Sequence, residues 1–367
     1  MFHRLVVLFV ALLALLTACS PAAQPTATAA RPSGTTTAPQ QTATPATNPF
    51  AGVSGIVDPG NTSWPRDVQG LNGKKTIKQK PQRIVTVSVG HDEMTLSLVQ
   101  PERLVAVGGA TKDPTYSNVA DLVKDLPVIT SKAESILAQS PDLVVTSPFL
   151  SPDTVAALEK VGVTVVQTDL RNDPEGRIQD ILFLGYMFGE EQRAASLARE
   201  VRDRYQALTA MTQTAPQSAR PKVLALTSYS GSIWTAGKGS TEGAVIEAAG
   251  GVNPAVAAGI DQNQVITKEG VITMKPDVIV ITQPTEFGGG DFMNDLLKDP
   301  VLADVPAIKG KKVFIVDSKL YTTLSFYNLL GAEHLAGLLW PEKMAGKPSA
   351  PFSKPGQGSA AADPYAY

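Results

Sequence analysis

Two glutamates occupy the same local setting in distant parts of the chain. Glu134 lies seven positions before a Pro-Asp pair, and Glu269 lies seven positions before a second one. An apolar run follows each pair at once, which predicts a buried strand, and the segment that carries each glutamate is predicted to be a short helix. Two carboxylates at equivalent places on two similar lobes could contact two cationic sites of one partner.

One of these glutamates also has a purely local explanation. Ser131 stands three residues before Glu134, a spacing that predicts a capping box in which both side chains satisfy the start of a helix. Ile266 stands three residues before Glu269, so the second copy lacks that pattern. A solvated surface carboxylate is the plainer alternative for both glutamates.

The single cysteine has a different chemical context. Met1–Arg4 carries positive charge, and Leu5–Leu16 is an apolar run too short for a bilayer-spanning helix, which needs ~20 residues. Small residues then lead directly into Cys19, as in a bacterial lipobox. Residues 1–18 are therefore predicted to be a signal peptide, with lipid attached to Cys19, and an unlipidated secretory leader is the alternative.

Segments near both ends of the chain have the composition of disordered sequence. Residues 19–60 are rich in Pro, Ala, Thr and Gln, and they are predicted to be a tether between the lipidated cysteine and the folded region. Residues 61–80 are polar and turn-rich, and they are predicted to be a short lead-in that could contain a hairpin. Residues 346–367 are predicted to be a disordered tail.

Composition limits the classes of function. The chain has 367 residues, 43% of them hydrophobic and 18% charged, with a formal net charge of −2. This balance provides no basic stripe of the kind that nucleic-acid binding needs, so we expect no nucleic-acid partner. A single Cys excludes an intrachain disulfide and a Cys-based zinc cage.

The remaining residues predict two α/β lobes. Residues 81–174 alternate short strands with short helices, which is the pattern of a doubly wound parallel sheet covered on both faces, and residues 214–345 repeat it. A strand that begins at Pro and ends in Ser opens each half. Residues 175–213 form a long amphipathic helical stretch, with a break expected at Gly189, that joins the lobes.

The order of these features resembles a known family. A lipobox, a Pro-Gln-Arg-Ile-Val strand, a Glu and Pro-Asp motif, a connecting helix and a second Glu and Pro-Asp motif follow one another between Cys19 and Asp317. Each motif is weak alone. Their order and the internal duplication are similar to the solute-binding proteins of ABC importers for ferric siderophores, haem and cobalamin, and the resemblance covers residues 81–340.

That resemblance implies a ligand cleft between two lobes that a single rigid helix connects. It implies a lipid-anchored, extracytoplasmic protein that performs no catalysis and needs no cofactor, and we expect a monomer. It also implies that Glu134 and Glu269 contact arginines on the two membrane subunits of the permease. The expected partners are a metal chelate, the ABC permease dimer and the membrane that holds the lipid anchor.

Ligand contacts are expected just beyond the carboxyl ends of the strands, where open α/β sheets bind ligands. His91 could ligate haem iron or corrinoid cobalt, or it could hydrogen-bond a chelate or merely cap the following helix. Aromatic candidates for a pocket wall, which could instead be core residues, are Tyr116, Phe149, Tyr229, Trp234 and Tyr321. Cationic candidates that could neutralise an anionic chelate, or be solvated surface charges, are Lys112, Arg171 and Lys238.

Three ligand classes stay open at this point. The cationic candidates favour a ferric siderophore, haem would predict His91 or Tyr116 as an axial ligand, and cobalamin is the third class. Outside the haem case, no metal is expected to bind the protein directly. A surface hydrolase fits less well because the sequence contains no Gly-x-Ser-x-Gly elbow, and a surface sensor on the same fold is a further alternative.

Overall fold

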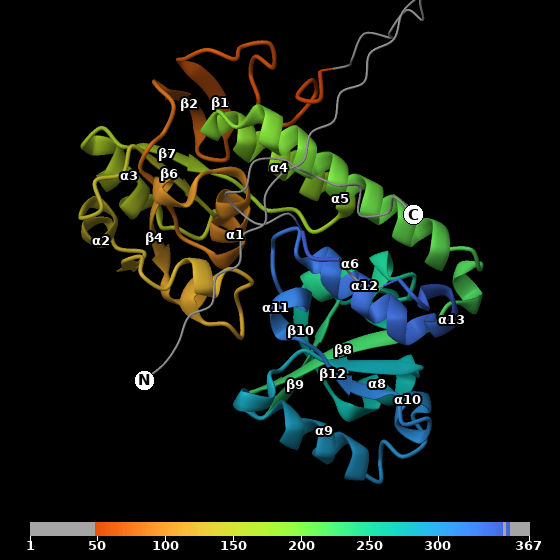
Figure 1. The fold of residues 1–367 in the computed structure, drawn as a ribbon. Helices are drawn as coiled ribbons and strands as arrows, with labels where there is room; N and C mark the ends of the chain where they lie inside the picture. Colours follow the sequence, from red (N-terminus) through yellow and green to blue (C-terminus); the bar gives the residue numbers. More distant parts are fainter. Residues whose placement is uncertain (1–47, 348–349, 353–367) are drawn as a thin grey trace, which may run out of the picture. The chain divides into compact units, whose positions relative to one another are not determined.

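The computed structural model describes residues 48–347 and 350–352, which contain two α/β lobes (Figure 1). The predicted signal peptide, Cys19 and most of the predicted tether lie outside the described residues. The first lobe is built on a sheet with the order β5-β4-β3-β6-β7, in which all neighbouring strands are parallel. Its strands are β3 (Ile84–Thr86), β4 (Leu104–Gly108), β5 (Val128–Ile129), β6 (Leu143–Thr146) and β7 (Thr164–Gln167).

Helices cover both faces of this first sheet. The strands β3 and β6 are buried along their whole length, and their alternating side chains enter two separate hydrophobic clusters. Helix α1 packs on one face, and α2 and α3 pack on the other. The elements are α1 (Val89–Leu98), α2 (Ala133–Leu137) and α3 (Pro152–Lys160), with 3-10 turns η1 (Pro101–Arg103), η2 (Gly109–Lys112) and η3 (Ala120–Leu122).

The second lobe has a sheet with the order β10-β9-β8-β11-β12. Strands β8, β11 and β12 are parallel, whereas β9 is antiparallel to both of its neighbours. The strands are β8 (Val223–Tyr229), β9 (Ser232–Ala236), β10 (Asn263–Ile266), β11 (Val278–Ile281) and β12 (Val313–Ile315). The helices and turns are η4 (Gln217–Ala219), α6 (Thr241–Ala248), α7 (Pro254–Ala257), α8 (Lys268–Met274), η5 (Thr285–Phe287), α9 (Gly289–Lys298), α10 (Pro306–Lys309), α11 (Ser318–Tyr321), α12 (Asn328–Leu339) and α13 (Pro341–Met344).

The two sheets share one strand order. In each lobe the first strand is central, the second and third lie on one side of it, and the fourth and fifth lie on the other. They differ at the second strand, because β9 follows β8 through a tight hairpin and therefore runs antiparallel to it. The repeated motifs of the sequence thus correspond to two lobes whose sheets have the same strand order. The direction of β9 is the difference between the two sheets.

The aspartates of the two Pro-Asp pairs hold the starts of the central strands. The Asp142 carboxylate accepts hydrogen bonds from the backbone N–H groups of Gln82 at 2.7 Å and Arg83 at 3.1 Å. The Asp277 carboxylate accepts one from the N–H of Lys222 at 2.8 Å. These donors stand just before β3 and β8, where no ladder bond satisfies them, so the repeat has a structural cause.

Two packed helices connect the lobes. They are α4 (Pro174–Phe188) and α5 (Glu191–Thr212), and α4 ends at Gly189, whose φ of 69° is a left-handed conformation that glycine adopts without strain. Helix α4 covers the first lobe, and α5 runs back along it to reach α6 and α12 of the second lobe (Figure 1). Residues 175–213 are therefore a helical hairpin, in which α5 alone is the long connecting helix.

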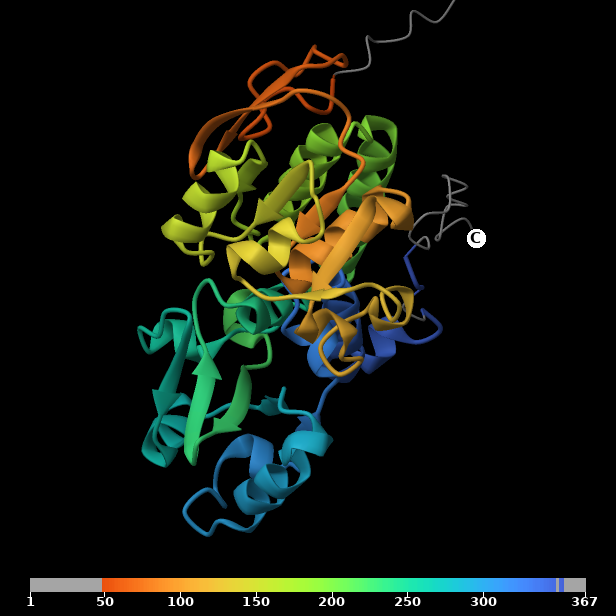
Figure 2. The same cartoon turned by 90° about the vertical axis from the view of Figure 1, so that its left-hand side faces the viewer.

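The residues before β3 form part of the first lobe. Phe50 and Val53 are buried, so the predicted tether ends at about residue 48 and not at residue 60. A β-hairpin follows, formed by β1 (Arg66–Gly70) and β2 (Gly73–Ile77), and it lies at the end of the first lobe remote from the second (Figure 2). This hairpin lies within the predicted lead-in.

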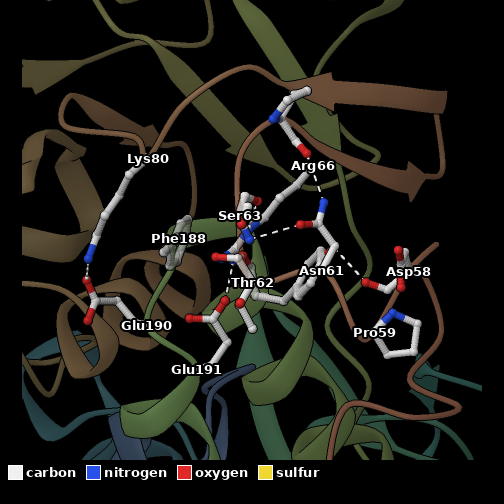
Figure 3. A network of polar contacts seen from close by, with 12 residues as sticks. Asp58, Pro59, Asn61, Thr62, Ser63, Arg66, Lys80, Phe188, Glu190 and Glu191 are labelled. Carbon is white, nitrogen blue, oxygen red and sulfur yellow. Dashed lines mark hydrogen bonds and ion pairs between the residues drawn. The ribbon is translucent and has the colours of Figure 1, made fainter.

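Arg66 fastens this segment to the turn between α4 and α5 (Figure 3). Its guanidinium donates to the carbonyl oxygen of Tyr186 at 2.5 Å and forms an ion pair with Glu191. Lys80 adds an ion pair with Glu190, with 2.7 Å between Nζ and Oε1. The segment therefore braces the sharp turn from which the connecting helix starts.

The other end of the connecting helix is fixed by a buried ion pair. Arg204 of α5 donates to Glu333 of α12 through two nitrogens, at 2.9 and 2.6 Å, in the bidentate geometry that orients both side chains. The Arg204 guanidinium also lies 4.1 Å from the ring centre of Phe352, which is buried. Phe352, which lies in the predicted disordered tail, therefore packs against the fold.

Candidate functional site

A cavity of about 740 Å³ lies between the two lobes and the connecting helix. The loops after β6 and β7 line it from the first lobe, α6 and the loop before it line it from the second, and the C-terminal half of α5 closes one side. Its charged or amide-bearing lining residues include Asp169, Arg171, Asn172, Asp173, Glu247 and Gln262. Apolar or aromatic lining comes from Phe149, Tyr205, Ala244 and Leu324.

Local structure explains how these residues reach the cavity. The loops after β6 and β7 leave the carboxyl ends of parallel strands, the edge at which open α/β sheets bind ligands. Ser240 begins α6 by accepting a hydrogen bond from the N–H of Gly243 at 3.0 Å, which turns the first residues of that helix toward the cavity. Tyr205, Thr209 and Gln213 share one face of α5 because they are four residues apart.

The arginine in the cavity wall is already paired within the first lobe. Arg171 donates to the Asp180 carboxylate through Nε at 2.9 Å and through Nη2 at 2.5 Å. Burial raises the pKa of Asp180, and the contact with Arg171 opposes that rise. Asp169, Asp173 and Glu247 are exposed in the lining, so carboxylates outnumber unpaired cations among the described residues there.

Direct contacts between the two lobes include one beside this cavity and one on another flank. Asn172 of the first lobe donates through Nδ2 to the carbonyl oxygen of Gly239 at 2.7 Å. On the other flank, the rings of Tyr116 and Phe287 stack with 5.8 Å between their centres. A smaller cavity of about 360 Å³ next to this stack is also lined by both lobes. Tyr116 therefore lies between the lobes, although it does not line the larger cavity.

His91 does not face either cavity. It is 1% exposed in α1, and both ring nitrogens have partners at 2.7 Å, Nδ1 with the Ser88 hydroxyl and Nε2 with the Thr168 hydroxyl. Burial lowers the pKa of His91 to about 4, so its imidazole is neutral. These contacts leave neither ring nitrogen free for a metal or a chelate, so of the roles that the sequence allowed for His91 they argue against the ligand role.

Two aromatic candidates of the second lobe lie away from the cavities described above, Tyr321 in the interior and Trp234 at a half-buried position. Tyr321 is fully buried in α11, and its hydroxyl lies 2.9 Å from Nδ1 of His334. Trp234 lies within β9, where it pairs with Val265 of β10, and not in a loop. Neither residue contributes to a cavity wall described above, so their positions favour the packing alternative over a place in the pocket wall.

Of the remaining ligand candidates, some line the large cavity and others do not. Phe149 is 93% exposed and Arg171 is half-buried, and both line the large cavity. Tyr229 is exposed at the end of β8, and Lys238 is exposed beside the lining residue Gly239, but neither lines the cavity. Lys112 donates to the carbonyl oxygen of Lys124 at 2.9 Å within its own lobe.

The two repeated glutamates are exposed in the first turns of short helices at matching places in the two lobes. Glu134 lies in α2, which begins at Ala133 with Lys132 as its N-cap, so the capping box predicted from Ser131 is absent. Glu269 lies in α8, and hydrogen bonds from its own backbone N–H and from Thr267 lower the pKa of its carboxyl. Nothing in these local contacts removes either carboxylate from solvent.

Several cavity residues were not predicted. Asn172 and Gln262 belong to polar loops without a recognisable motif, and Glu247 is a charged residue in the largely apolar helix α6. The face of α5 that carries Tyr205, Thr209 and Gln213 did carry a signal, because a four-residue spacing of polar groups continues beside the apolar face. Within the described ranges, no cluster of His, Cys, Asp and Glu could hold a metal ion, and no helix is long and apolar enough to cross a membrane.

The related sequences found by comparison with known proteins include the following three. The chain is 24% identical over 276 residues to the ABC transporter substrate-binding lipoprotein YvrC of Bacillus subtilis, which covers 74% of this chain and 84% of that protein. It is 30% identical over 210 residues to a cobalamin-binding protein of Halobacterium salinarum, with 56% and 55% covered. It is 25% identical over 298 residues to the ferric enterobactin-binding periplasmic protein FepB of Escherichia coli, with 76% and 92% covered.

The fold and a family model agree with these sequences. The periplasmic heme-binding protein RhuT from Roseiflexus superposes with a TM-score of 0.62 and 27% identity, over 71% of this chain and 99% of that one. A model of the family described as periplasmic binding protein matches residues 84–320, from β3 to α11. The chain therefore belongs to the periplasmic binding protein family, the substrate-binding components of ABC importers.

Proposed function

We propose that this protein captures a preformed metal chelate in the cavity between its lobes and delivers it to an ABC permease. The observation that carries the proposal is the cavity of about 740 Å³, whose wall is supplied jointly by both lobes and α5. Its volume falls within the range of pockets that enclose a drug-sized ligand, ≈ 300–1,000 Å³. Capture, lobe movement and delivery make and break no covalent bond.

The charge of the wall favours a neutral or cationic chelate. Arg171 is neutralised by Asp180, whereas Asp169 and Glu247 remain available to the ligand, and Asp173 keeps its charge while one of its oxygens accepts from the N–H of Gly176. A strongly anionic ligand would meet uncompensated carboxylates, while a cation would be attracted to them. We therefore favour a ferric siderophore whose complex carries no net negative charge, such as a ferric hydroxamate. The sequence favoured a siderophore because of its cationic residues, whereas the carboxylates of the wall are the reason here.

Cobalamin is the second candidate. It carries a rim of amide groups, and the wall offers Asn172, Gln262 and Gln213 as amide partners. The sequence likeness to a cobalamin-binding protein supports the same class. Its size would require the two lobes to separate further than they do in this structure.

Haem has less support from the wall. Among the described residues that line the cavity, the only side chain of the usual axial-ligand types is Tyr205. Its hydroxyl donates to Asn328 at 3.1 Å, and burial raises the pKa of this phenol to about 12. Tyr116, the other tyrosine considered for haem, does not line this cavity.

The proposal includes two further elements. Glu134 and Glu269 would seat the protein on cationic sites of the two permease subunits, one from each lobe, since both are exposed at equivalent positions. A lipid on Cys19 would hold the protein at the outer face of the membrane, with the residues before 48 as its tether. The likeness to the lipoprotein YvrC supports this arrangement.

A titration of the purified full-length chain tests the ligand class. Tryptophan fluorescence and visible absorption are followed while ferrioxamine B, ferric enterobactin, cyanocobalamin or haemin is added. We expect the monocationic ferrioxamine B to bind at least about tenfold more tightly than the trianionic ferric enterobactin, a difference of ~1.4 kcal/mol. Tighter binding of cyanocobalamin would select the second candidate. Exclusive binding of ferric enterobactin, or a Soret shift lost in Tyr116→Phe, would overturn the proposal for the cavity.

A further inference from the structure

Residues 323–325 belong to the second lobe by sequence, since they connect α11 to α12, but both of their hydroxyls and one of their carbonyl groups bond to residues of the first lobe. The hydroxyl of Thr323 donates to Oε2 of Glu93 at 2.6 Å, and the hydroxyl of Ser325 donates to the same oxygen. Glu93 lies in α1 and is 0% exposed. A carboxylate of the first lobe therefore holds a segment of the second.

The other oxygen of this carboxylate completes the link. Oε1 of Glu93 accepts hydrogen bonds from the backbone N–H of Asn118 at 2.7 Å and from its side-chain amide at 2.9 Å. The same amide donates to the carbonyl oxygen of Lys319 at 3.1 Å. A buried carboxylate is costly unless its oxygens are satisfied, and here half of its donors come from each lobe. Separating the lobes at this point would strip two donors from it.

A second buried side chain holds the centre of the same segment. Arg177 of α4 is 0% exposed, and its Nη1 donates to the carbonyl oxygen of Leu324. Its Nε and Nη2 have no hydrogen-bond partner within the described residues. The hydrogen bond from Nη1 to Leu324 is therefore important, because losing it would leave a buried guanidinium with fewer partners at a cost in stability.

Close packing against α1 also holds residues 323–325 on the first lobe. A Cβ atom built on Gly90 of α1 would lie 2.9 Å from Cβ of Leu324, closer than side-chain carbons approach. Only glycine therefore allows the segment to lie directly on α1. The side chain of Leu324 is 37% exposed and forms part of the wall of the large cavity. The first lobe thus determines where this wall residue of the second lobe stands.

We propose that Glu93 and Arg177 are positioning residues that hold residues 323–325 on the first lobe, as a second link between the lobes beside α5. When the lobes separate, this segment stays with the first lobe and limits the opening. Leu324 is thereby kept in the cavity, and its contact with a ligand is transmitted to α1 and α4. The part of this inference that concerns ligand binding depends on the proposed function, whereas the link itself does not.

The ligand-free protein tests the link without any assumption about the ligand. The full-length chain carries Cys19→Ser, and spin labels are attached at Glu134→Cys and Glu269→Cys, one exposed site on each lobe. Pulsed dipolar spectroscopy then measures the distribution of distances between the labels. We expect Thr323→Val with Ser325→Ala to broaden this distribution and shift it to longer distances. Glu93→Gln should do the same to a smaller extent, because it keeps one acceptor oxygen.

A matched control separates positioning from ordinary stability. Thr235 is buried, and its hydroxyl donates to the carbonyl oxygen of Ala225 at 2.8 Å, wholly inside the second lobe. Thr235→Val should lower the melting temperature but leave the label distances unchanged. An unchanged distribution in the Thr323/Ser325 variant, or an equal broadening in Thr235→Val, would overturn the inference. If the double variant fails to fold, the label distances in Glu93→Gln test the link by themselves.

Affinity for ferrioxamine B supplies the second readout. Loss of the link should weaken binding by about tenfold in the Thr323/Ser325 variant and leave Thr235→Val within about twofold of the parent. If the parent protein binds no chelate, the proposed function fails while the distance measurement still decides the link. If chelate binds and the distances do not change, the link fails and the proposed function stands.

Discussion

His91 and Asp92 are neighbouring ionisable residues that are both buried in α1, and burial changes their proton affinities in opposite directions. Burial lowers the pKa of His91 to about 4 and raises the pKa of Asp92 to about 8. The Asp92 carboxyl is satisfied by the hydroxyls of Thr86 and Thr111, which oppose that rise. Both side chains are therefore neutral in the folded protein at neutral pH, which is how a buried site avoids unpaired charge.

These pKa shifts predict how stability depends on pH. Between pH 3.8 and about 8 the folded state keeps the Asp92 proton that the unfolded chain releases, so stability falls as pH rises. Below the unfolded pKa of 6.5, His91 contributes the opposite slope, so the Asp92 effect stands out between pH 6.5 and 8. We expect the free energy of unfolding to fall there by at most ~1.4 kcal/mol per pH unit.

Asp92→Asn removes this proton and preserves the shape of the side chain. Urea unfolding of the variant at pH 6.5, 7.2 and 8 should show a clearly smaller loss of stability than the parent shows over the same range. Equal slopes in the two proteins would mean that Asp92 is ionised when folded, contrary to its buried setting.

At the residue scale, the sequence predicted the surface positions of residues that belong to a repeated pattern. It did not predict whether a single polar residue is exposed or buried. Glu134 and Glu269 could be found because both stand before a Pro-Asp pair, and both are exposed. His91 follows a strand end just as a cleft residue would, but Thr168, from a distant part of the chain, covers its ring. A local sequence pattern cannot predict a hydrogen-bond partner that comes from a distant segment of the chain.

At the scale of elements, the hairpin of α4 and α5 depends on close contact near its turn. A Cβ atom on Gly185 would lie 2.1 Å from Cβ of Ala194, so the two helices touch at this point without a side chain between them. Larger residues here would force the helices apart. Because α5 carries one side of the cavity, the contact also determines where that wall stands.

Gly185→Ala should therefore destabilise the protein by ~1–3 kcal/mol, the usual cost of overpacking. Ala194→Gly in the same chain should restore part of the loss, because it empties the space that the new methyl group needs. Gly337→Ala in α12 is the matched control, since a Cβ there meets no atom within 4 Å and should be neutral or stabilising by up to ~1 kcal/mol. A Gly185→Ala variant as stable as the control would refute the close contact.

Elements were predictable in proportion to how apolar they are. The buried strands β6 and β11 follow Pro-Asp pairs and are almost wholly apolar, and both lie where the sequence predicted buried strands. Strands β9 and β10 were missed because they are short, partly polar and poorly buried, and β10 is exposed along most of its length. The pairing of β9 with β8 forms them, and that pairing has no signature in either segment alone.

At the scale of the whole molecule, the proposed docking of Glu134 and Glu269 on a two-subunit permease can be tested in cells. We expect Glu134→Ala with Glu269→Ala to reduce uptake by at least about tenfold in cells and to leave chelate affinity within about twofold, because the charges act on docking alone. Glu102→Ala with Glu342→Ala is the control, since it removes the same charge from exposed sites on the two lobes. Equal uptake in the two double variants would exclude the docking role.

The location of the ligand is the claim on which the transport function depends. Ala244 lies in the wall of the large cavity on α6, so Ala244→Trp would fill space that a chelate needs. Ala258→Trp, at an exposed position outside that wall, adds the same side chain without blocking it.

The decisive measurement is the affinity of ferrioxamine B for these two variants and for the parent, determined by fluorescence titration of the full-length chain. We predict a loss of at least about tenfold for Ala244→Trp, with Ala258→Trp within about twofold of the parent. Unchanged affinity in a folded Ala244→Trp protein would contradict a ligand site between the lobes.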